Sequence, residues 1–326
     1  MSSSPAHRAA SPAAVWLALS AVYVIWGSTY LAIRVVVEAD VPPLLAMGGR
    51  FLAAGALLAA VVAARSGTSA LRVDRRGLGS SLAMGAMLLL GGNGLVAVAE
   101  QTVPSGLAAL LVATTPLFLV LLQLVTGSRP RGATWAGVLV GFGGVALLAL
   151  RGGGISGVQG WGVAVVVAAT LSWAIGSFLS GRLALPGDPL VATVWEMLLG
   201  GVVLVVVGLV AGEGPALHLA AVPAKAWFAW AYLVTAGSML GYTAYVWLLG
   251  HAPLSLVSTY AYVNPAVAVL LGWAVLAEPV TGIVLVGGAL VVAGVALVVS
   301  AERPRRRRVR ETEAAAQGET LPEPAA

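Results

Sequence analysis

The chain has 326 residues, of which 59% are hydrophobic and 10% charged, and its mean hydropathy is +0.95. Soluble domains carry roughly 25% charged residues, so this composition excludes a water-soluble protein and predicts a surface that faces lipid. The chain has no cysteine, which excludes disulfides, thiolate metal sites and iron–sulfur clusters. Its net charge is +5, but six of the eighteen basic residues lie between Arg303 and Arg310. A cytoplasmic tail beside anionic headgroups explains that run better than a specific RNA or lipid site.

Ten hydrophobic runs, bounded by Gly, Pro or charged residues, predict ten transmembrane helices of about 20 residues each. The expected spans are 14–34, 43–64, 79–99, 104–125, 132–150, 160–181, 189–211, 226–249, 253–276 and 280–300. The first run is long, lacks a clear small-residue cleavage site and is followed by many more, so we interpret it as a helix and not as a secretory signal. The predicted fold class is an all-α membrane protein.

The distribution of Lys and Arg predicts the orientation of these spans. Fourteen of the eighteen basic residues fall on the side of the N-terminus, three fall on the other side, and Arg50 lies within a span. By the positive-inside rule, both termini are cytoplasmic. We therefore expect a multi-pass protein of the inner or plasma membrane, with a cytoplasmic tail at 1–13 and a basic, disordered one at 301–326.

An internal repeat divides the chain into two five-helix units. The stretch from Gly92 to Pro116 matches the stretch from Gly241 to Pro265 at an offset of 149, and Pro104 matches Pro253. The predicted units are 14–150 and 160–300, joined by a linker at 151–159. Because five is odd, the second unit enters the membrane inverted, an arrangement that accompanies alternating access in carriers. The alternative is that the duplication only builds a stable bundle.

Ionisable residues are rare inside the spans, and each is a candidate site because a charge in hydrocarbon is costly. Arg50 and Glu196 lie roughly 10 Å deep from opposite surfaces, so we do not expect them to pair. We expect Arg50 to face Glu100 or Glu278, near the outer ends. Glu196 is either a proton-binding carboxyl for coupled exchange or a hydrogen-bonding partner of a neighbouring helix.

Neutral polar and aromatic residues share helix faces by their i, i+3 and i+4 spacing, and could line one central cavity. The alternative for each aromatic is packing or an interfacial belt. Thr115 and Asn264 each precede a proline that interrupts the helical hydrogen bonds. Glycine rows at 137–144 and 287–294 predict close helix packing, within the chain or across a homodimer. The cavity candidates are Trp26, Tyr30, Asn93, Trp173, Ser177, Tyr242, Tyr245, Tyr260 and Asn264.

Several kinds of catalytic and cofactor motif are missing from the sequence. The Gly-rich stretch at 152–154 is not followed by the lysine of a phosphate-binding loop. No His-Glu-x-x-His or Gly-x-Ser-x-Gly motif is present, and the three histidines are scattered in predicted loops. We therefore predict no enzyme activity, no metal site and no cofactor.

Motifs along the whole chain resemble those of the EamA-domain carriers of the drug/metabolite transporter superfamily, and within them the YedA-type inner-membrane exporters. The resemblance implies two inverted five-helix repeats around a cavity, and export of amino acids, metabolites or drugs. The first half has Gly127-Ser128 where family repeats often have Gly-Glu, while the second half keeps Glu278. The motifs are Trp26-Gly27-Ser28-Thr29-Tyr30-Leu31-Ala32-Ile33-Arg34, Arg50-Phe51, Gly92-Asn93-Gly94, Ala99-Glu100-Gln101, Pro104-Ser105-Gly106, Glu196-Met197-Leu198 and Tyr260-Ala261-Tyr262-Val263-Asn264-Pro265.

These observations predict a secondary transporter that moves a small amphipathic molecule by alternating access, outward and in exchange for protons. Its expected partners are that substrate and the lipid bilayer, and not a nucleic acid. The alternative is a membrane receptor or scaffold that binds a small ligand without moving it.

Overall fold

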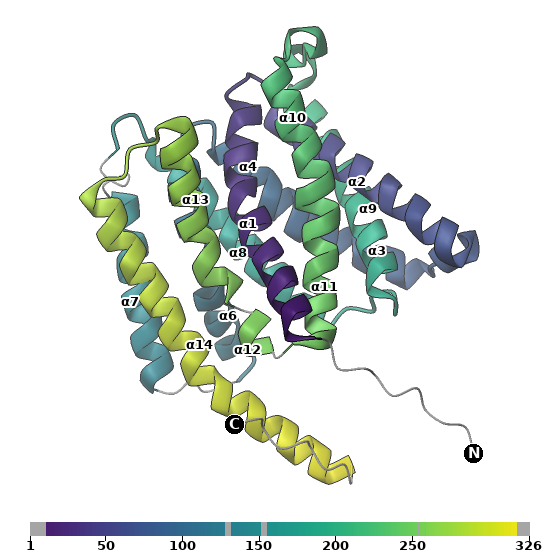
Figure 1. The fold of residues 1–326 in the computed structure, drawn as a ribbon, viewed down its shortest axis with the longest axis vertical. Helices are drawn as coiled ribbons and strands as arrows, with labels where there is room; N and C mark the ends of the chain where they lie inside the picture. Colours follow the sequence, from purple (N-terminus) through teal and green to yellow (C-terminus); the bar gives the residue numbers. More distant parts are fainter. Residues whose placement is uncertain (1–10, 128–131, 151–154, 253, 258, 318–326) are drawn as a thin grey trace.

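The computed structural model describes residues 11–127, 132–150, 155–252, 254–257 and 259–317, and within these ranges the chain forms helices and turns with no strand (Figure 1). Up to residue 150 the α-helices are α1 (Pro12–Val37), α2 (Pro43–Ser66), α3 (Arg75–Met84), α4 (Leu95–Ala99), α5 (Ser105–Val112), α6 (Thr115–Val125) and α7 (Gly132–Leu150). From residue 160 they are α8 (Gly160–Ser180), α9 (Pro189–Val210), α10 (Ala224–Tyr232), α11 (Gly241–His251), α12 (Leu254–Val257), α13 (Tyr260–Leu276) and α14 (Gly282–Gln317).

Eight helical segments in the described part of the chain are long and apolar enough to cross a membrane. A ninth is reached if Gly214–Ala221 and Ala224–Tyr245, which meet at 109°, count as one span. The predicted span at 253–276 corresponds to α12 and α13, and α13 has 17 residues, fewer than the roughly 20 that a full crossing requires. The all-helical class is confirmed, while the ten-helix arrangement remains a prediction.

Two of the predicted spans contain a π-helical segment in their middle. η2 (Gly85–Gly94) joins α3 to α4, and η6 (Leu233–Leu240) joins α10 to α11. At the repeat offset of 149 these two segments overlap, so both units have the same irregularity in their third helix. π-Helical turns are uncommon and occur often at functional sites.

The two units meet through matching pairs of helices. α2 packs against α9, α5 against α13, and α7 against α14, which lies beside it in Figure 1. α1 packs against α11 and α13, and correspondingly α8 packs against η2 and α6. For each of these helix pairs, the equivalent helices with the two units exchanged also pack against each other.

Glycines set the separation between α7 and α14. A Cβ added at Gly137 would lie 2.7 Å from the backbone oxygen of Gly294, and one added at Gly144 would lie 2.7 Å from that of Gly287. The predicted glycine rows therefore pack against each other within the chain. This contact is made inside one chain, so it gives no support to a dimer, and the homodimer stays a prediction.

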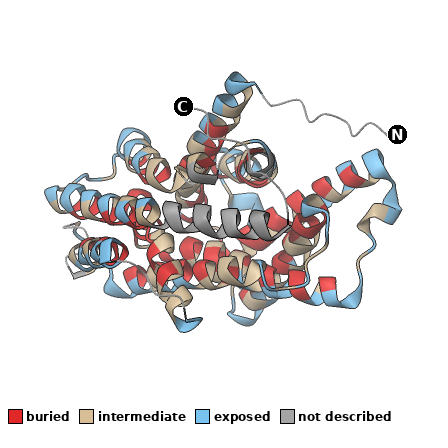
Figure 2. Cartoon of the chain, turned by 90° about the horizontal axis from the view of Figure 1, so that it is seen from below, coloured by how far each residue is buried: buried red, intermediate tan, exposed pale blue. Residues whose placement is uncertain are grey.

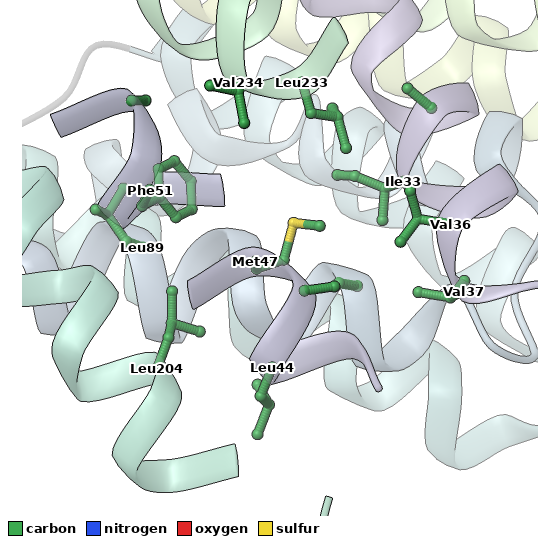
Figure 3. Close-up of a cluster of buried hydrophobic side chains, with 14 of the residues drawn as sticks. Ile33, Val36, Val37, Leu44, Met47, Phe51, Leu89, Leu204, Leu233 and Val234 are labelled. Atoms are coloured by element: carbon green, nitrogen blue, oxygen red, sulfur yellow. The ribbon is translucent and has the colours of Figure 1, made fainter. Parts of the chain in front are cut away.

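The largest of the buried apolar clusters lies where α1, α2, α9 and the two π-helical segments meet (Figure 3). Met47 and Leu204 are fully buried in it. Figure 2 shows that helices carry a buried face toward their neighbours and exposed residues on the outside. That outside is apolar, with Val125, Leu139 and Phe228 more than 70% exposed, which is the surface expected of a protein solvated by lipid.

The last helix extends beyond its predicted end. We expected the final span to end at residue 300 and a disordered tail to follow, whereas α14 continues to Gln317. Its membrane-crossing part is Gly282–Ala301. The extension has no glycine between residues 295 and 317 and is rich in Ala, Arg and Glu, which favour helix.

Candidate functional site

Three aromatic candidates form one cluster between α1, α11 and α13. The ring of Trp26 lies 5.0 Å from that of Tyr245 and 5.3 Å from that of Tyr260, and the two tyrosine rings are 5.7 Å apart. The Trp26–Tyr260 and Tyr245–Tyr260 pairs are edge to face, the geometry that aromatic quadrupoles favour. One turn earlier on α1, the Tyr23 hydroxyl hydrogen-bonds that of Thr259. Three residues distant in sequence thus form one aromatic cluster, Trp26, Tyr245 and Tyr260, which we call the aromatic wall.

Glycines allow this wall to form. A Cβ at Gly241 would lie 2.7 Å from Nε1 of Trp26, and a Cβ at Gly27 would lie 2.6 Å from Cβ of Val267. α1 therefore approaches both α11 and α13 closely. Asn264, on the same stretch of α13, is 9% exposed, and its side-chain oxygen accepts no hydrogen bond from the described part of the protein.

Trp173 of α8 and Asn93 of η2 lie where these two segments pack against each other. The ring of Trp173 packs on Gly92, where an added Cβ would lie 2.6 Å from its Cε3 atom. Next to this contact, Nδ2 of Asn93 donates to the Leu88 carbonyl at 3.3 Å, so the amide is held within its own π-helical turn. Ser177 lies one turn along α8 from Trp173.

Glu196 lies on α9, half-buried, with Tyr242 and Thr193 beside it. The Thr193 hydroxyl donates to the Pro189 carbonyl at 2.7 Å. Tyr242 lies three residues before Tyr245 on α11, the helix that supplies one ring of the aromatic cluster. Glu196 therefore lies beside one of the cavity candidates, Tyr242.

Arg50 is 4% exposed on α2, and it pairs with neither of the carboxylates that we expected. Its Nε donates to Oγ of Ser238 in η6 at 2.9 Å, and its Nη1 approaches the Met47 sulfur at 3.7 Å. Its guanidinium lies 4.6 Å from the centre of the Phe51 ring, a cation–π distance. The expected ion pair is not formed among the described residues, because the Arg50 side chain turns to η6 and donates to Ser238 there.

Glu278 caps a helix of the other unit. Its Oε1 accepts the backbone N–H of Ser105 at 2.8 Å, and its Oε2 accepts that of Gly106 at 3.1 Å and the Ser105 hydroxyl at 3.0 Å. A carboxylate at a helix N-terminus satisfies the unpaired N–H groups and complements the helix dipole. Ala277, in the left-handed conformation at φ 54°, turns the chain so that Glu278 faces α5.

Glu100 is 0% exposed at the end of α4, and neither of its carboxyl oxygens has a hydrogen-bond partner in the described part of the protein. Tyr30 lies close enough to Glu100 to interact with it electrostatically. Arg34 donates to the backbone carbonyl of Glu100, not to its carboxylate, and pairs with Glu38 at 2.7 Å. Arg34–Glu38 is the one salt bridge found among the described residues.

Sequence reasoning missed several polar residues of these contacts. Ser238 was hidden inside an apolar run, and the Ser28–Tyr232 hydroxyl pair, 2.6 Å apart, joins residues 204 positions apart. Glu213 accepts the N–H groups of Leu44 and Leu45 at the start of α2. The sequence could have indicated Glu213, because it is a single carboxyl shortly after a predicted span, the position that Glu278 also has.

Two surface hollows lie away from the nine cavity candidates. One, of about 550 Å³, is an apolar groove between α5, α13 and α14 that includes Trp273. The other, of about 310 Å³, lies between the loops that precede α3 and α9 and includes Asp74 and Asp188, the caps of those helices. Neither is lined by a cavity candidate, so the expected central cavity is not one of these two hollows.

The lipid-facing apolar surface and the membrane-length helices define a multi-pass α-helical membrane protein. The model of the EamA-like transporter family matches residues 12–150 and again residues 160–300. The chain belongs to the EamA-like transporter family, which confirms the resemblance drawn from its motifs.

Individual relatives agree with this assignment. The inner membrane transporter YedA of Escherichia coli K12 is 41% identical over 283 residues, covering 86% of this chain and 89% of the relative. A probable terminal-alkyne amino-acid exporter of Streptantibioticus cattleyicolor is 32% identical over 304 residues, covering 90% and 96%. A solved crystal structure of a protein shares the fold, with a TM-score of 0.60 and 22% identity over 88% of this chain and 98% of the other.

Proposed function

We propose that this member of the EamA-like transporter family is a secondary active transporter of the inner membrane that exports small amphipathic metabolites, amino acids first among them, by alternating access in exchange for protons. The observation that carries the proposal is the exchange symmetry of the helix pairs, in which α1 contacts α11 and α13 as α8 contacts η2 and α6. A bundle built this way has two related arrangements, because either unit can take the conformation of the other.

The proposed topology is ten spans in two inverted repeats, 14–150 and 160–300, with both termini cytoplasmic. The matching π-helical segments support it, and so does Figure 1, where α1 begins and α14 ends on the same side of the bundle. The chain has no cysteine, so single cysteines can test it. An impermeant maleimide added to intact cells should label Ala216→Cys and spare Ser69→Cys, and the reverse pattern would overturn this orientation.

The substrate contacts that we propose are the aromatic wall of Trp26, Tyr245 and Tyr260, with Asn264 beside it. Aromatic faces bind apolar and cationic groups, and the side-chain oxygen of Asn264, which has no partner among the described residues, offers an acceptor to an amine or hydroxyl. The name of the relative in Streptantibioticus cattleyicolor, an amino-acid exporter, makes amino acids the first class to test.

Transport can be tested in inside-out vesicles with a panel of labelled amino acids and drugs, with and without an uncoupler. We expect uptake that falls with the uncoupler and is lost in Trp26→Ala. The matched control is Trp16→Ala, which removes the same ring from the same helix where it is 56% exposed. Binding of a labelled compound without counterflow would favour the receptor or scaffold instead.

Proton exchange has its own test at Glu196, the half-buried carboxyl beside Tyr242. Glu196→Gln removes the titrating group while keeping the size of the side chain. We expect the variant to lose the effect of the uncoupler on uptake. Unchanged, still proton-dependent transport would show that Glu196 has only a structural role.

A further inference from the structure

A second buried carboxyl, Glu100, lies in the unit that lacks a counterpart of Glu196. It follows α4 directly. Ala99, just before it, and Val103, three residues after it, belong to a buried apolar cluster that Tyr30 also contacts. Its side chain is 0% exposed and both oxygens are without a partner among the described residues. A carboxylate in such a place would have lost its water and gained no hydrogen bond in return, which is a costly state.

The charged groups around Glu100 do not neutralise it. Arg34 is committed to Glu38 and to the backbone carbonyls of Glu100 and Val103. Glu278 carries a second negative charge and has both oxygens committed to α5. Arg34, Glu38 and Glu278 together already sum to a net negative charge, so ionised Glu100 would add like-charge repulsion to desolvation.

We infer that Glu100 is a proton-binding site, occupied in this conformation. The carboxylate takes a proton from hydronium: an O–H bond forms at one of its oxygens, and the O–H bond of hydronium that carried the proton breaks and leaves water. A metal ion would need several oxygen ligands, and Glu278 is already engaged, so a proton is the ligand that this site fits. That this proton is exchanged for substrate during transport rests on the proposed function.

Tyr30 connects the site to the aromatic wall. It lies one turn after Trp26 on α1, and it is close enough to interact electrostatically with both Glu100 and Tyr260. Tyr30 therefore belongs both to the apolar cluster around Glu100 and to the helix that carries Trp26. Protonation at Glu100 and substrate binding at Trp26 would meet at this residue.

The test is infrared difference spectroscopy of the full chain in lipid vesicles, titrated with pH and without any substrate. We expect a C=O stretching band of a protonated carboxylic acid that Glu100→Gln removes and that Glu278→Gln leaves in place. A spectrum of Glu100→Gln identical to that of the natural sequence would overturn the proposal.

A second variant covers the case in which Glu100→Gln does not reconstitute. Glu100→Asp keeps a carboxyl at the site but changes its side chain, so it should shift the frequency of the band if Glu100 is protonated, and an unshifted spectrum would overturn the site. The measurement needs no substrate. A band present without any transport would therefore count against the proposed function alone, and transport without the band against the proton site alone.

Discussion

The two repeat units of this transporter meet along α7 and α14 through glycines, and at the beginning of α5 through the carboxylate of Glu278. In the first contact backbones approach so closely that an added Cβ would have no room. In the second, one side chain accepts two backbone N–H groups and a hydroxyl of the other unit. Water can replace hydrogen bonds at little net free energy, whereas it offers nothing in place of tight packing. We therefore expect the α7–α14 contact to stay fixed and the α5 contact to open and close during transport.

The glycine contact should give the largest effect on stability. Gly144→Leu places a side chain against the backbone oxygen of Gly287 and the backbone nitrogen of Val291, neither of which can move without moving α14. We expect a loss of about 3 kcal/mol or more, seen as a fall in monodisperse protein and in melting temperature. The adjacent Gly143→Leu is the control, since no atom of the described residues lies within 4 Å of its added Cβ. Equal behaviour of the two variants would break the comparison.

The carboxylate contact should give the next largest effect. Glu278→Ala leaves the Ser105 and Gly106 N–H groups and the buried Ser105 hydroxyl without their acceptor, which should cost about 2 kcal/mol in thermal unfolding. Glu38→Ala is the control, because it removes only a partly exposed ion pair worth at most about 1 kcal/mol. If Glu278→Ala melts like the natural sequence, the cap does not hold the units together.

The contact between Arg50 and Ser238 should be intermediate in strength. Ser238→Ala removes the acceptor of a buried guanidinium N–H, and we expect a loss of about 1.5 kcal/mol. Thr235→Ala, an exposed hydroxyl in the same π-helical segment, should change stability by less than about 0.5 kcal/mol. A silent Ser238→Ala would mean that Arg50 finds another partner.

The smallest effect concerns the turn before Glu278. Ala277 has a φ of 54°, and Gly127, at the equivalent position of the first unit, has a φ of 84°. Because a side chain costs about 1 kcal/mol in the left-handed region, Ala277→Gly should raise the stability by that amount, and Gly127→Ala should lower it similarly. Changes of opposite sign in the melting temperatures of the two variants would confirm the equivalence of the two turns, and changes of the same sign would refute it.

Several features could be predicted from the sequence because they follow from local patterns. Apolar runs predicted the all-helical membrane class, and the order of short motifs indicated the EamA family, which the two matches of the family model confirm. The glycine rows predicted close packing, and α7 and α14 show it. The partner of Arg50 could not be predicted in this way, because depth along a straight helix says nothing about which neighbour faces the side chain.

The sequence by itself determined the membrane class, the duplication and the residue types available for a site, because hydrophobicity and repetition are properties of the chain. Only the tertiary structure decided which of those residues meet. It joined Trp26, Tyr245 and Tyr260 into one wall, gave Glu278 to α5, and left the Glu100 carboxyl buried with no hydrogen-bond partner among the residues that the structure describes. Such contacts depend on how α1, α11 and α13 rotate and approach one another, and close packing across hundreds of residues sets that geometry.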